Sequence, residues 1–443
     1  MATMTMLLLV LTMAAFLISI VSFSIEKLSR YYVPISIACA TIACILFVQL
    51  LQPAGDIKGM VLGFIEFKAL IYIFSMQVTV TIIERERIFQ YLAIRLIRLT
   101  RGNPRLLFYV FCMTTTFFAA VIADVTVSII FAPLIIRICG ILDTKPTPYL
   151  LGMTININLG SLITPFSSSE NIIISTARSL DLSYYITHLW VFFAIIFTIT
   201  TVSIDLLMIR NKVPADKQRQ STLLTILTPS MVIDKKHAKR FKMNMGLTFA
   251  FFAFIIITPE SYLAALLGAM GLLLANKGQF NALIKQVEWE IIFFFTSLFI
   301  LIGILSRPEV GFLQAVSAGF NAMSGGNALL AVMLIFMISS AMSAIISNAP
   351  VTLMFLPIIE SLLLQPGFSN LAVPLSTALL LGVNLGGNFL PQGAACDIMT
   401  LTIAKRNNIP GFTYKYLFKV GGSYATLHFL LSLGFLAVMM VWY

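Results

Sequence analysis

The feature that most limits how this chain can fold is a series of apolar runs, each long enough to cross a lipid bilayer as a helix. A transmembrane helix needs about 20 predominantly apolar residues. Because many such runs follow one another, we expect an all-α polytopic membrane protein. Bounded by charges, Pro or Gly, the runs are 4–23, 33–51, 66–84, 187–209, 243–259, 261–276, 288–306 and 415–441.

The composition agrees with this expectation and excludes several classes of protein. Hydrophobic residues make up 59% of the 443 residues and charged residues 11%, whereas soluble domains average about 45–50% and about 25%. The five cysteines show no disulfide or zinc-ligand spacing. The sequence also has no Walker, GxSxG or HExxH motif. We therefore expect neither an enzyme nor a cofactor-binding protein, and no nucleic-acid partner.

Four further apolar stretches are interrupted. Two carry a Pro and a group of polar residues near the middle, and we expect each to enter and leave the membrane on one side as a re-entrant hairpin. Two are broken by Pro and Gly, and we expect each to cross once as a discontinuous helix. The hairpins are 106–140 and 332–362, and the discontinuous helices are 148–178 and 374–404.

The two halves of the chain, 1–209 and 243–443, match each other on either side of a basic linker at 210–242. Three blocks correspond in the same order, with Asn, Gly and Pro at matched places. Matched interruptions in two halves are typical of secondary transporters. The pairs are IADVTVSIIFAPLI (122–135) with ISNAPVTLMFLPII (346–359), NLGSLITPFSSSEN (158–171) with NLGGNFLPQGAACD (384–397), and IEFKALIYIFS (65–75) with VEWEIIFFFTS (287–297).

The positive charges predict the orientation. If each half crosses the membrane five times, nearly all of the 29 Lys and Arg residues fall on one side, which is then cytoplasmic. An odd number of crossings inverts the second half relative to the first. We therefore expect two inverted five-span repeats in a plasma (inner) membrane, with both termini extracytoplasmic. The exceptions to the charge pattern are Lys58, Lys68, Arg178 and Arg307.

One segment, 85–105, intersperses Arg with apolar residues at helical spacing. This pattern predicts an amphipathic helix lying on the cytoplasmic interface. Farther along, Asp205 comes shortly before Arg210, and we expect the two to be neighbours at the surface with no role in transport. The apolar face of the interfacial helix is predicted to hold Ile88, Phe89, Leu92, Leu96 and Leu99.

The candidate site is the set of polar residues that the matched blocks place at membrane depth. A charge at the centre of a spanning helix costs about 2.5–3.5 kcal/mol on insertion scales, so such residues are functional candidates. Of these, Glu170 is predicted to lie nearest the solvent. The set is Asp124, Thr126, Asn158, Gly160, Thr164, Ser168, Glu170, Asn171, Ser347, Asn348, Thr352, Asn384, Gly386, Gly387, Asn388, Gly393 and Asp397.

Within this set each half offers one carboxylate and one amide, in swapped order. The first half has Asp124 at the hairpin tip and Asn171 in the break, and the second has Asn348 and Asp397. We interpret the four as two related sites for Na⁺ or a proton beside a central substrate site. Alternatively they cap broken helix ends. Because the matched blocks 122–135, 158–171, 346–359 and 384–397 hold no basic residue, a bound anion would depend on backbone N–H groups, hydroxyls and the coupling ion.

At these motifs the chain resembles the ion transporter superfamily, which includes arsenite permeases, citrate permeases, divalent-anion/sodium symporters, Na⁺/H⁺ antiporters and the melanosomal P protein. The resemblance is most specific at 287–303, 343–359 and 384–399. It implies inverted repeats with hairpins and unwound helices, and in some relatives dimers and an elevator-like movement. Ala123-Asp124 and Asp397 depart from the family pattern by adding carboxylates, which suits proton or Na⁺ coupling.

We therefore expect an ion-coupled secondary transporter of a small anion or oxyanion, such as an organic acid or arsenite. A Na⁺/H⁺ antiporter is the first alternative, and a passive ion channel is the second. The expected partners are the transported ion, the lipid bilayer and a second copy in a homodimer. The sequence leaves open whether a separate ATPase subunit drives transport.

Overall fold

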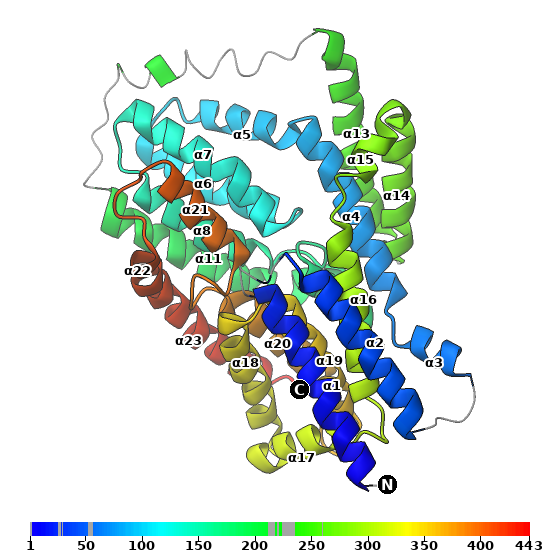
Figure 1. Ribbon diagram of the computed structural model, residues 1–443. Coiled ribbons are helices and arrows are strands. Elements are labelled where there is room, and N and C mark those ends of the chain that lie inside the picture. The colour runs from blue at the N-terminus through cyan, green and yellow to red at the C-terminus, as the bar shows by residue number, and fades with distance from the viewer. Residues whose placement is uncertain are drawn as a thin grey trace.

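The computed structural model describes residues 2–24, 28, 30–51, 56–210, 218, 221–223, 235–258 and 260–443. Within these residues every regular element is helical (Figure 1). Most of the basic linker expected at 210–242 lies outside them. In the first half the helices are α1 (Ala2–Ser24), α2 (Tyr32–Leu51), α3 (Ile57–Gly63), α4 (Phe67–Arg85), α5 (Ile88–Leu99), α6 (Pro104–Ala119), α7 (Asp124–Leu142), α8 (Thr147–Gly160), α9 (Ser169–Arg178), α10 (Leu182–His188) and α11 (Trp190–Ile204).

The second half repeats this order of long and short helices. A π-helical turn, Asp205–Ile209, closes α11 before the linker. The last residues of the predicted linker already belong to α13 (Lys235–Ile257). The helices that follow are α14 (Ser261–Ala275), α15 (Phe280–Ile284), α16 (Trp289–Leu305), α17 (Phe312–Ser324), α18 (Ala328–Ile345), α19 (Asn348–Leu363), α20 (Ala372–Gly386), α21 (Ala395–Arg406), α22 (Tyr414–Tyr416) and α23 (Gly422–Met439).

Among the described helices, eight are long and apolar enough to cross a membrane. A ninth candidate is α14 with the segment Lys277–Ile284, which bends by 83°. Six of the eight coincide with runs predicted from the sequence; the other two, α7 and α18, belong to the stretches predicted as hairpins. The helix α16, which was predicted to span, has 17 residues.

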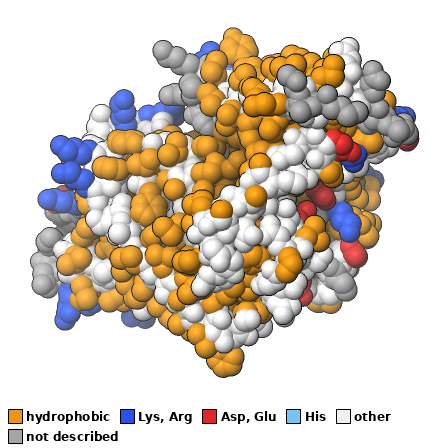
Figure 2. Space-filling model, turned by 90° about the horizontal axis from the view of Figure 1, so that it is seen from below, with side chains coloured by type: hydrophobic (Ala, Val, Ile, Leu, Met, Phe, Trp, Pro, Cys, Tyr) orange, Lys and Arg blue, Asp and Glu red, His pale blue; other side chains and the backbone are white. Residues whose placement is uncertain are grey.

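The outer surface has the character of a membrane protein. Large apolar side chains are exposed along α1, α11, α13 and α23, where Val191 is 70% and Ile257 80% exposed. Figure 2 shows the end of the molecule that is lowest in Figure 1, where hydrophobic and uncharged side chains cover the middle and charged side chains lie toward the edges. Apolar surface of this extent is expected where a protein contacts lipid.

The helices form two groups, which lie on the right and left of Figure 1. The scaffold group consists of α1, α2, α4, α13, α14 and α16, and the core group consists of α6–α11 and α18–α23. Packing pairs recur between the halves. They are α1–α2 with α13–α14, α2–α16 with α14–α4, α6–α8 with α18–α20, α7–α21 with α19–α9, and α8–α11 with α20–α23.

The stretches predicted as hairpins and broken helices divide near their middles. A short turn joins α6 to α7, and a still shorter one joins α18 to α19. Irregular segments separate α8 from α9 and α20 from α21. We call the segments 161–168 and 387–394 the first and second break. The two groups touch each other mainly where α4 meets α9 and α16 meets α19.

The predicted interfacial helix is present as α5, which lies across the top of Figure 1. Its buried face differs from the predicted one. Ile88 and Phe89 are buried, together with Ala93 and Ile97, whereas Leu99 is 71% exposed and Leu96 39% exposed. Leu92 is half-buried, so the buried stripe is displaced from the predicted leucines toward Ala93 and Ile97.

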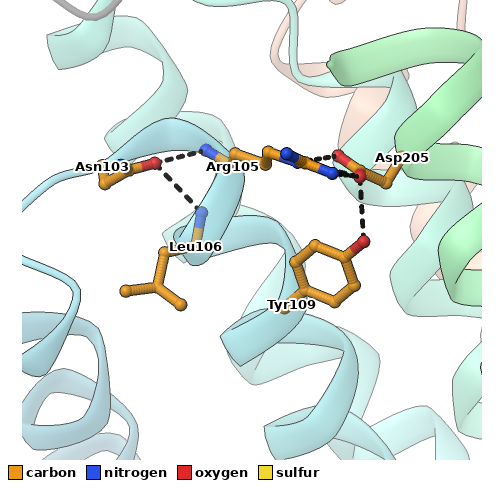
Figure 3. A network of polar contacts seen from close by, with 5 residues as sticks. All are labelled: Asn103, Arg105, Leu106, Tyr109 and Asp205. Carbon is orange, nitrogen blue, oxygen red and sulfur yellow. Dashed lines mark hydrogen bonds and ion pairs between the residues drawn. The ribbon is translucent and has the colours of Figure 1, made fainter.

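The expectation for Asp205 was wrong. Its side chain is fully buried, and its carboxylate accepts hydrogen bonds from Arg105 Nε (2.9 and 3.0 Å) and Nη2 (2.5 Å) and from the Tyr109 hydroxyl (2.8 Å). Asn103 caps the same turn of α6 by accepting from the N–H groups of Arg105 and Leu106 (Figure 3). Spacing along the chain could not reveal this ion pair, because its partners lie 100 residues apart.

This ion pair predicts an asymmetric response to mutation. Arg105→Ala leaves a buried carboxylate with only the Tyr109 hydroxyl, whereas Asp205→Ala leaves an arginine that is 48% exposed and that water can solvate. We therefore expect Arg105→Ala to lower the melting temperature of the purified protein more than Asp205→Ala does. Arg105→Lys should fall between Arg105→Ala and the unaltered protein, since lysine cannot form the forked contact. An equal or reversed order would contradict this assignment.

Candidate functional site

The predicted site residues lie where the two breaks meet the first turns of α7 and α19. The helix α7 begins at Asp124 and packs against α21, and α19 begins at Asn348 and packs against α9. Each half thus places its helix start against the broken helix of the other half. As a result, residues more than 200 positions apart in the sequence form one buried polar cluster.

The first break is held by Asn171, whose side chain is fully buried. Its Nδ2 donates to the carbonyl oxygens of Ser161 and Thr164 (3.2 Å for Thr164) and to Ser167 Oγ (2.9 Å). Ser168 caps α9 by accepting from the N–H of Asn171. The amide of Asn171 therefore closes the break into a compact loop.

The second break is built differently. Asp397 takes the place that Asn171 has in the first break, and its Oδ1 accepts a hydrogen bond from Thr154 of α8. A Cβ added to Gly393 would lie 2.7 Å from the Gly387 carbonyl oxygen and 2.9 Å from the oxygens of two residues in the last turn of α18. Close glycine packing therefore shapes this break, in which a carboxyl group stands in place of the amide that donates hydrogen bonds in the first break.

Amide side chains connect the two halves. Asn384 Nδ2 donates to Asn171 Oδ1 (2.8 Å), and Asn158 Nδ2 donates to Asn388 Oδ1 (2.5 Å). Cys396 Sγ lies 3.2 Å from Asn158 Oδ1. Asn384 Oδ1 and Asn388 Nδ2 are buried and have no hydrogen-bond partner among the described residues. These two atoms therefore have hydrogen-bonding capacity that the described residues do not use.

Three carboxylates lie close together in this cluster. Asp124 is half-buried and contacts Ser161 Oγ (3.4 Å), and its helix α7 packs against α21, which carries Asp397 in its first turn. Glu170, predicted nearest the solvent, is only 6% exposed and accepts from Asn348 Nδ2 (3.0 Å). Within the described residues no Lys, Arg or His is paired with any of the three. Buried carboxylates without a cationic partner favour the binding of a cation or proton.

A cavity of about 230 Å³ adjoins the cluster. The scaffold group lines one side of it through α4 and α16, and the first break and both helix starts line the other. Thr126, Ser168 and Ser347 line the cavity, as do the sequence neighbours Ala123, Ser169 and Ala349 of Asp124, Glu170 and Asn348. Its charged lining residues are Glu84 and Glu288, and no Lys, Arg or His of the described part of the chain lines it. We call it the inner cavity.

Two glycines at matched positions bring the broken helices close to the adjoining helices. A Cβ added to Gly160 would lie 2.6 Å from the Thr116 carbonyl oxygen of α6, and one added to Gly386 would lie 2.4 Å from the Ser340 carbonyl oxygen of α18. Small residues at helix crossings allow such close packing in membranes. The two contacts are equivalent in the two halves.

The remaining predicted residues occupy the edge of the cluster. Thr164 of the first break donates to the Ala120 carbonyl in the turn between α6 and α7. Thr352 is buried one turn beyond Asn348, and its hydroxyl has no partner among the described residues. The sequence reasoning missed Thr154, Cys396 and Ser343, although Thr154 precedes Asn158 by one helical turn. Ser343 donates to Asn348 Oδ1 (2.6 Å) and to the Val383 carbonyl (2.7 Å).

Comparison with known proteins places this arrangement among transporters. The citrate transporter family matches residues 20–382. A 46 kDa membrane protein of Mycobacterium leprae is 26% identical over 349 residues, which is 78% of this chain and 80% of that protein. An uncharacterized transporter of Mycobacterium tuberculosis is 26% identical over 356 residues, 80% of this chain and 82% of that protein. The human P protein is 24% identical over 436 residues, 82% of this chain and 52% of the P protein.

Proposed function

Because the chain belongs to the citrate transporter family, we propose that this membrane transporter carries a small anion, such as an organic acid or an oxyanion, and couples its movement to Na⁺ or a proton. The observation that carries the proposal is the cluster beside the inner cavity, in which Glu170 and Asp397 are buried and Asp124 is half-buried. A cavity of about 230 Å³ has room for a small organic acid with several waters.

The proposed architecture is a pair of inverted repeats, each with a re-entrant hairpin and a discontinuous helix. It is supported by the packing pairs that recur between the halves and by the equivalent contacts of Gly160 and Gly386. In this arrangement α6–α7 and α18–α19 enter the membrane from opposite sides. The helix pairs α8–α9 and α20–α21 then each cross once, with their breaks at the midplane.

The substrate anion is held by backbone dipoles and hydroxyls. The first turns of α7, α9 and α19 adjoin the inner cavity, and Ser167, Ser168, Ser169 and Ser347 line it. Helix N-termini favour anions because their first N–H groups are unpaired and carry partial positive charge. Since none of the described basic residues lines the cavity, the coupling cation supplies the compensating positive charge.

Asp124 and Asp397 hold the coupling ion. Each has a hydroxyl beside it, Ser161 beside Asp124 and Thr154 beside Asp397. Oxygen-rich sites suit Na⁺, and a carboxylate can also carry a proton. Asn348 is positioned by Ser343 and Glu170, while Asn171 gives the first break its shape.

A Na⁺/H⁺ antiporter is the second candidate, and one observation favours it. Both carboxylates that depart from the family pattern, Asp124 and Asp397, lie in the cluster without a basic partner among the described residues. In an antiporter the two carboxylates would bind Na⁺ and H⁺ alternately, with no anion carried.

Uptake of labelled anions into proteoliposomes tests the proposal. We expect saturable uptake of citrate, a dicarboxylate or arsenite that depends on an imposed Na⁺ or proton gradient and stops when an ionophore removes that gradient. Uptake that is linear with concentration and insensitive to the gradient would indicate a passive channel. No uptake of any anion, together with Na⁺-driven proton movement, would favour the antiporter.

A further inference from the structure

A second cavity, of about 200 Å³, lies between the same two helix groups at the other end of α4. We call it the outer cavity. It is lined by Lys68 and Tyr72 of α4, by Ser175 and Thr176 of α9, and by Ser261 at the start of α14. The inner cavity adjoins the opposite half of α4, from Ile73 to Glu84. The two cavities thus adjoin successive parts of α4.

Three elements line both cavities, and on each the residues that line one cavity lie within a few positions of those that line the other. On α4, Tyr72 lines the outer cavity and Ile73 the inner one. In the first break, Pro165 lines the outer cavity and Phe166 the inner one. On α9, Ile172 faces the inner cavity, and the next turn faces the outer one.

We propose that the two cavities are the opposite mouths of one substrate path, and that Phe166 is the side chain that separates them. This inference rests on the proposed transport function. Phe166 is only 4% exposed, and its ring lies 6.0 Å from that of Phe252 on α13. It therefore spans the contact between the core group and the scaffold group.

The wall has the composition of a barrier to ions. Phe166, Ile73 and Ile172 present apolar surface across the path, and an apolar constriction excludes hydrated ions. The flanking surfaces are polar, with serine and threonine hydroxyls on both sides. Because Phe166 lies in a break, a shift of this loop relative to α4 would open one mouth and close the other without unfolding a helix.

Cysteine accessibility tests the path without knowledge of the substrate. In the full-length protein in oriented vesicles, Thr81→Cys samples the inner cavity and Thr176→Cys the outer cavity. A membrane-impermeant maleimide should label each variant from one side of the membrane only, and the two sides should be opposite. The unaltered protein, in which the described cysteines are free but buried or half-buried, provides the background.

Removing the barrier should abolish this sidedness. Adding Phe166→Ala to Thr176→Cys should make the thiol reactive from both sides, and the milder Phe166→Leu should give slower labelling from the second side. Phe192→Ala is the matched control, because Phe192 is also 4% exposed but lines neither cavity. Melting temperatures identify any variant that is misfolded.

Three results would overturn the inference. They are labelling of both thiols from the same side, no labelling of Thr176→Cys from either side, and sidedness that both Phe166 variants leave unchanged. A failure of the unaltered protein to take up any anion would instead count against the proposed function, because the labelling does not depend on uptake.

Discussion

Asp124→Asn and Asp397→Asn are each expected to reduce gradient-driven anion uptake to the level of empty vesicles. Both substitutions keep the size of the side chain and remove the charge that would hold Na⁺ or a proton. Stability should be unchanged or higher, since a charge at membrane depth costs about 2.5–3.5 kcal/mol on insertion scales. Uptake assays and melting curves on the same preparations measure the two effects.

A matched control separates loss of the coupling site from a general loss of charge. Glu360→Gln removes a carboxylate from α19, the helix that begins at Asn348, at an exposed position away from the cluster. We expect this variant to transport normally. Full activity in both Asp variants would remove these residues from the mechanism. A loss of both stability and activity would indicate that the carboxylates serve only to cap the broken helices.

Gly160→Ala and Gly386→Ala should have the second-largest effect, because each would force a methyl group against a backbone carbonyl at 2.6 or 2.4 Å. Backbone cannot move aside as a flexible side chain can, and overpacking typically costs about 1–3 kcal/mol. We expect each variant to melt at a lower temperature and to transport more slowly, since the break beyond the glycine is displaced. The two variants should behave alike, because Gly160 and Gly386 occupy equivalent positions in the two halves.

Gly434→Ala is the control for these variants. Gly434 lies within α23, and nothing lies within 4 Å of an added Cβ. Replacing it should leave stability unchanged or raise it by about 0.4–1 kcal/mol through the loss of chain entropy in the unfolded state. If Gly160→Ala and Gly386→Ala prove as stable as Gly434→Ala, the broken helices do not pack closely against α6 and α18.

Much of the fold could be predicted from the sequence, because membrane depth sets the length of the apolar runs. The run 33–51 became α2, and the stretch 148–178 divided at the predicted Gly and Pro into α8 and α9. The all-helical membrane character and the family were both confirmed. The matched blocks also contain the residues that gather in the cluster. Polar residues and breaks are costly in a spanning helix, so they occur together in these few blocks.

The parts that could not be predicted depend on contacts between distant segments. Nothing near Asp205 in the sequence points to Arg105, and nothing near Glu170 indicates that Asn348 would cover it. The buried face of α5 includes Ala93 and Ile97 and leaves out Leu96 and Leu99, a choice set by packing against other helices. The sequence around Thr154 is that of an ordinary helical threonine, and only the folded chain brings Asp397 of α21 into contact with it. Local patterns carry no information on such pairings.

The most direct test of ion-coupled anion transport is a record of lumenal pH in proteoliposomes, first on adding Na⁺ alone and then on adding citrate, a dicarboxylate or arsenite. We predict no proton movement with Na⁺ alone. If the coupling ion is H⁺, an anion should then produce a saturable pH change that Asp124→Asn abolishes. If it is Na⁺, the anion should instead drive ²²Na⁺ uptake with the same dependence on Asp124. Saturable proton movement driven by Na⁺ with no anion present would contradict the account and establish an antiporter.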